Sequence, residues 1–67
     1  MTAKEMFEAL GFEEKFHIAY IKFYNIKKDL YIWFQKDVKT VEANFDITMP
    51  ILKAINQQCK ELGWLDE

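Results

Sequence analysis

The chain of 67 residues contains only two glycines, and both stand in the same setting. Leu10-Gly11-Phe12 follows a short helix-forming segment, and Leu62-Gly63-Trp64 follows a longer one. A glycine after the last turn of a helix adopts the left-handed conformation, and the apolar residue after it folds back on that turn as a Schellman-type stop. The sequence therefore predicts one helix near each end of the chain.

The starts of these helices carry their own signals. Thr2-Ala3-Lys4-Glu5 has the form of a capping box, which predicts a first helix over about residues 3–10. Thr48 can cap the second helix, with Pro50 in its first turn, where a missing N–H costs nothing. Apolar residues recur on one face of this second helix, which predicts roughly four amphipathic turns: Ile51, Leu52, Ile55, Cys59 and Leu62.

Between the helices, aromatic and β-branched residues become frequent and glycine is absent, as is typical of strands. Three runs can be separated, at residues 16–24, 30–35 and 40–45, joined by short polar segments. Connections this short imply antiparallel hairpins. We therefore predict an α+β fold of one domain over residues 1–67, in the order α-β-β-β-α, with both helices packed on one face of a three-stranded antiparallel meander.

Alternation along the strands predicts which side chains face the helices. In the second strand Leu30, Ile32 and Phe34 point one way, and in the third Val41 and Ala43 do the same. The first strand contains apolar residues of both parities, which indicates a bulge or a strand buried on both sides. There the inward set is predicted to be Ala19, Ile21 and Phe23.

Composition limits the class of protein. Apolar residues make up 51% and charged residues 30% of the chain, too apolar for disorder and too interrupted by charge for a membrane span. No basic leader precedes an apolar segment, and a single cysteine cannot form an internal disulfide, so we expect a cytoplasmic protein. Net charge is −2, there is no arginine, and residues 15–39 carry six Lys and two Asp.

The helix-bearing ends of the chain carry a family resemblance. Residues 1–7, Leu10-Gly11-Phe12, Ile47-Thr48-Met49, residues 54–56 and residues 61–64 resemble small uncharacterised proteins of prophages and mobile elements in Gram-positive bacteria. The resemblance covers about half of the chain and implies the two helices and a phage setting. It implies no activity and no catalytic residue.

No group of residues predicts an enzyme, a cofactor or a metal site. Cys59 lies on the apolar stripe in the last turn of the second helix, where the helix dipole disfavours a thiolate. His17 has no predicted polar partner, and one His with one Cys does not make a zinc site. The adjacent Glu13 and Glu14 point to opposite sides of an extended segment and are expected to solvate the loop before the first strand.

The sheet face turned away from the helices is the candidate site. Its predicted interaction residues are Tyr20, Lys22, Tyr24, Tyr31 and Trp33. The rings could stiffen the sheet, bind a protein partner or a second copy in a homodimer, or stack on single-stranded nucleic acid with nearby lysines on the phosphates. The lack of arginine and the negative net charge count against nucleic acid. We therefore expect a non-enzymatic, phage-associated accessory protein that binds a protein or itself through this face.

Overall fold

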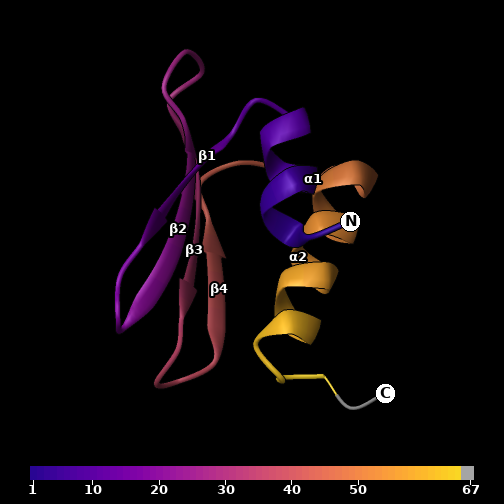
Figure 1. Ribbon diagram of the computed structural model, residues 1–67. Coiled ribbons are helices and arrows are strands. Elements are labelled where there is room, and N and C mark those ends of the chain that lie inside the picture. Colours follow the sequence, from indigo (N-terminus) through magenta and orange to yellow (C-terminus); the bar gives the residue numbers. More distant parts are fainter. Residues whose placement is uncertain (66–67) are drawn as a thin grey trace.

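Two helices cover one face of a four-stranded antiparallel sheet in the computed structural model, which describes residues 1–65 (Figure 1). The elements in chain order are α1 (Ala3–Ala9), β1 (Glu13–Phe16), β2 (Tyr20–Asn25), β3 (Leu30–Gln35), β4 (Thr40–Ala43) and α2 (Met49–Glu61). The strands lie in the order β1-β2-β3-β4, so each is paired with its neighbours in sequence. The α+β class, the meander and the placement of both helices on one face are as predicted.

The predicted number of strands is wrong, because the segment 16–24 is a hairpin and not one strand. His17 and Tyr20 exchange backbone hydrogen bonds of 2.9 and 3.3 Å, which leaves only Ile18 and Ala19 in the turn. The conflict of parity in this segment has its cause here, because the turn separates β1 from β2. Ile21 and Phe23 are buried as predicted, whereas Ala19 is exposed in the turn.

β1 begins earlier than predicted and includes both adjacent glutamates. Glu13 pairs with Tyr24 and Glu14 with Phe23, so the two carboxylates do lie on opposite faces of the sheet. They belong to an edge strand and not to the loop in which we expected them. At the other edge, β4 ends at Ala43 and not at residue 45.

Both helices end as their glycines predict. Phe12 N–H donates to Phe7 O at 3.0 Å and Trp64 N–H to Cys59 O at 2.9 Å, the long-range bond of a Schellman motif in each case. Gly11 has φ +93°, a conformation that favours glycine, and a Cβ added there would lie 3.1 Å from Asn25 Nδ2, so the side chain of Asn25 would have to shift slightly.

The two helix starts differ. The capping box of α1 is complete: Glu5 N–H donates to the Thr2 hydroxyl at 3.1 Å, and Thr2 N–H donates to the Glu5 carboxylate at 2.8 Å. The hydrogen bond from Thr2 N–H lowers the pKa of the Glu5 carboxyl. Thr48 occupies the N-cap position of α2, but its side chain makes no capping hydrogen bond.

Four phenylalanine rings form the centre of the core between the sheet and the helices. Phe7 of α1 stacks on Phe23 of β2 at 4.0 Å between centroids and meets Phe34 of β3 edge-on at 6.3 Å. Phe12 packs against Phe7 at 5.9 Å. Phe45 and Trp64 are partly buried against its rim.

Candidate interaction face

The sheet face away from the helices, called the outer face below, collects the predicted ring residues. Strand register places them in adjacent cross-strand pairs, Tyr24 opposite Tyr31 and Lys22 opposite Trp33. Tyr20 pairs with Gln35 one step further along. All four rings are half-buried and not fully exposed.

Lys22 lies at the centre of the outer face and joins two of the rings. Its Nζ lies 5.1 Å from the centroid of the Tyr31 ring and 5.9 Å from that of Trp33. An ammonium within about 6 Å of an aromatic face is attracted by the ring quadrupole. The lysine therefore holds both rings in place and contributes a positive charge at the middle of the surface.

A hydrogen bond to the neighbouring edge strand fixes the Tyr31 ring. The Tyr31 hydroxyl donates to Glu42 Oε2 at 2.9 Å. This bond to the carboxylate raises the pKa of Tyr31, because the neutral phenol is the form that donates. Glu42 also lies opposite Trp33 in the register, so one carboxylate borders both rings.

The far end of the outer face continues the aromatic row into the β1–β2 turn. Tyr20 meets Trp33 edge-on with 5.6 Å between centroids, and His17 stacks on Tyr20 at 4.6 Å with an interplanar angle of 10°. The His17 ring is oriented by Ala19 N–H, which donates to Nδ1 at 3.1 Å. This partner of His17 could not be predicted, because the turn that brings it to Tyr20 carries no sequence signal.

Trp33 is held by ring packing and by Lys22, and not by a side-chain hydrogen bond within the described part of the chain. Among residues 1–65 no hydrogen-bond acceptor reaches its buried indole Nε1. A buried donor without a partner costs about 1–3 kcal/mol relative to one that is satisfied. The packing of the ring therefore favours tryptophan at this position, and its indole N–H group contributes nothing favourable.

The charges of the outer face are balanced. Glu13, Lys15, Lys22 and Glu42 give two charges of each sign. The other lysines of the basic middle segment lie in the turns at the two ends of the sheet, Lys27 and Lys28 at one end and residues 36–39 at the other (Figure 1). They form no continuous basic track along the rings.

The two side chains considered for catalysis lie on opposite faces of the sheet. Cys59 packs against the core from α2, and burial raises the pKa of its thiol, so it stays protonated near neutral pH. His17 stacks on the outer face. The structure does not bring together the thiol and the base that a nucleophilic site requires.

Within residues 1–65 there is no group of three or more His, Cys, Asp or Glu side chains that could hold a metal ion. No helix in this range is long and apolar enough to cross a membrane.

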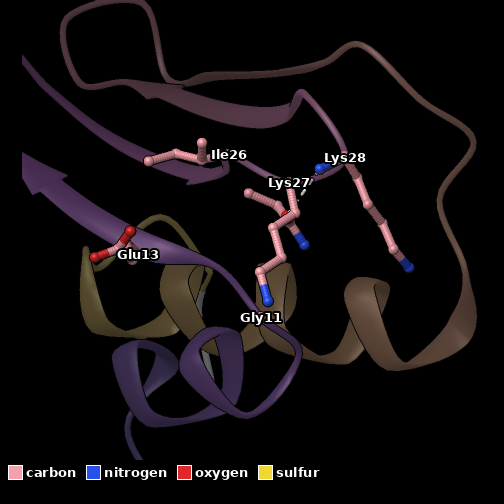
Figure 2. A pocket seen from close by; sticks show the side chains of 6 residues that line it. Gly11, Glu13, Ile26, Lys27 and Lys28 are labelled. Carbon is pink, nitrogen blue, oxygen red and sulfur yellow. Dashed lines mark hydrogen bonds between the residues drawn. The ribbon is translucent and has the colours of Figure 1, made fainter.

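A hollow between the end of α1 and the β2–β3 turn is lined by two lysines (Figure 2). The side chain of Lys27 extends toward Gly11, and that of Lys28 points away. The side chain of Asn25 stabilises the turn itself, since Lys28 N–H donates to its Oδ1 at 3.1 Å. Both lysines are exposed, and this hollow has the character of a solvated turn.

Comparisons with models of protein families, with curated proteins and with solved structures find no match for this chain.

Proposed function

We propose that the protein is a non-enzymatic accessory protein of the cytoplasm, of phage or mobile-element origin, that binds a protein partner through the outer face. The observation that carries this proposal is the clamping of Tyr31 and Trp33 by Lys22, with Glu42 fixing Tyr31 from the far side. Rings that are already ordered lose little conformational entropy when a partner covers them. Tyr and Trp are also the residues most enriched among interface hot spots.

Charge supports a protein partner over nucleic acid. A single-stranded polymer needs a basic groove that follows its phosphates, whereas the outer face carries as many carboxylates as ammonium groups. A patch of rings surrounded by balanced charge resembles the centre and rim of a protein interface.

The test compares proteins retained from a bacterial lysate by the wild type with those retained by Trp33→Ala, identified by mass spectrometry and then measured as purified pairs. We expect the dissociation constant of the true partner to rise by about 30-fold or more in Trp33→Ala, as for a hot-spot residue. Trp33→Phe should retain most of the binding, because the ring remains and the lost N–H has no partner.

A matched control is available at the edge of the other face. The Phe16 ring is 67% exposed and lies on the sheet face that the helices cover, since Phe16 pairs with Ile21. Phe16→Ala therefore removes an exposed ring but leaves the outer face unchanged. Equal binding by the wild type and folded Trp33→Ala would refute the proposal. Salt-sensitive binding of a mixed-sequence DNA oligonucleotide that quenches Trp fluorescence would replace it with the nucleic-acid function.

A further inference from the structure

The two edges of the sheet expose backbone groups that pair with nothing inside the sheet. Asn44 N–H donates to Tyr31 O at 3.4 Å, and Lys36 N–H donates to Ala19 O at 3.1 Å. Hydrogen-bonded and non-bonded residue pairs alternate along an antiparallel pair of strands. Counted from either of these two bonds, Thr40 and Glu42 are the residues of β4 whose backbone groups bond to β3. The N–H and C=O groups of Val41 and Ala43 therefore point outward from β4.

At the opposite edge, β1 has no register that both overlaps most of the strand and avoids a like-charge pair with a second copy. The same alternation, set by the His17–Tyr20 pair, directs the backbone groups of Glu14 and Phe16 outward. Antiparallel pairing through these groups centres on Glu14 opposite Glu14, on Lys15 opposite Lys15 or on Phe16 opposite Phe16. The first two place like charges directly opposite each other, although the first also sets Glu13 opposite Lys15 twice, and the third overlaps only the end of the strand.

The edge of β4 has apolar surface beside it. A groove between β4 and α2 is lined by Val41, Ala43, Phe45, Ile47, Leu52 and Ile55. Val41, Ile47 and Leu52 are 38%, 42% and 46% exposed. A strand added to β4 would cover this groove from the side, so that backbone pairing and apolar burial would occur together.

The sequence of β4 is complementary to itself in one register. With Val41 opposite Val41 of a second copy, Thr40 of each copy lies opposite Glu42 of the other, and a hydroxyl faces a carboxylate twice. The register shifted by one step, with Val41 opposite Ala43, would instead place Glu42 opposite Glu42. In the favoured register Lys39, which precedes β4, lies opposite Ala43 of the other strand, one position from Glu42.

We infer that two copies of this chain associate through antiparallel pairing of their β4 edges, with Val41 on the two-fold axis. The axis is then perpendicular to an eight-stranded sheet, so that all four helices lie on one side. The outer faces of the two copies form one continuous surface on the other side. The dimer uses only Thr40 and Glu42 at the margin of the outer face and leaves the rings of both copies uncovered.

The test uses the sign of a charge at one exposed position. Thr40→Lys should tighten the dimer because the ammonium faces Glu42 of the other copy, and Thr40→Glu should weaken it through repulsion at the same place. With two such pairs in each dimer, we expect a change of roughly tenfold in dissociation constant in each direction, measured by sedimentation over a wide concentration range. Lys15→Glu at the β1 edge is the control and should not change the association.

Cross-linking tests the register independently. In a Cys59→Ser background, Val41→Cys should form an intersubunit disulfide, because bonded antiparallel pairs place their Cα atoms about 5.5 Å apart. Glu42→Cys should not. Preferential cross-linking at Glu42→Cys would overturn the register, and monomers at all concentrations for the wild type and Thr40→Lys would overturn the dimer. The proposed function is tested separately by Trp33→Ala. Trp33 lies among the rings of the outer face, so this substitution should leave dimerisation, measured by sedimentation, unchanged.

Discussion

At the scale of single residues, the Tyr31–Glu42 hydrogen bond connects the centre of the outer face to its edge strand. The bond spans 2.9 Å and joins neighbouring strands, so it restrains a ring that would otherwise rotate at the surface. Its effect on titration can be measured in isolation, because only three tyrosines are present.

The raised pKa of Tyr31 predicts a delayed ionisation at alkaline pH. The folded state favours the neutral phenol, so this contribution to stability is complete below the ordinary tyrosine pKa of about 10 and is lost as pH rises through the raised value. Titration of tyrosinate absorbance should show one of the three tyrosines ionising later than in unfolded protein. Glu42→Gln should bring that transition back toward the ordinary range, whereas Glu13→Gln should not.

Residue positions on the outer face could be predicted from parity alone, but their mutual contacts could not. Alternation correctly places Tyr31, Trp33 and Lys22 on one side of the sheet. The ring contact of Tyr20 with His17 depends on a turn whose two residues, Ile18 and Ala19, have no positive φ. Asn-Gly and Asp-Gly are the usual sequence signals of two-residue hairpin turns, and they mark turn types that require positive φ. The turn at Ile18 and Ala19 is of another type, so the sequence does not indicate this hairpin.

At the scale of elements, the two helices are tied together by the last residue of α2. Glu61 Oε2 accepts from Ala3 N–H at 2.8 Å and from Gln57 Nε2 at 2.9 Å. The carboxylate satisfies one of the free N–H groups in the first turn of α1 and lies at the positive end of that helix. Both helices could be predicted from the sequence but this link could not, because residues 58 positions apart carry no local signal.

Glu61→Ala should therefore loosen α1 more than α2. We expect the free energy of unfolding to fall by about 1–2 kcal/mol, the usual effect of leaving such a donor unpaired. Urea denaturation measures this loss, and amide hydrogen exchange should increase first in α1. Glu8→Ala, an exposed change within α1, is the matched control; an equal loss there would show that the link is unimportant.

At the scale of the whole molecule, the small core makes association relevant to stability. A domain of this size buries only about 60% of the surface of its unfolded chain. If the β4 edges pair, the melting temperature must rise with protein concentration, because a species that binds only the folded state stabilises it by mass action.

This dependence is measured by calorimetry or circular dichroism at several concentrations. The wild type should show an increase in Tm with concentration, and Thr40→Glu should show a smaller one or none. A Tm that is independent of concentration in the wild type would contradict the dimer at the whole-molecule scale.

The hydrogen bond between Ala3 and Glu61 has a practical consequence for how the protein displays its surface. It brings the beginning of α1 close to the end of α2. Both helices lie in one layer on a single side of the sheet (Figure 1). A fluorophore, affinity tag or fused domain attached before Ala3 would lie on the opposite side of the sheet from the rings. The protein can thus be immobilised from that end with its aromatic surface fully presented to solution.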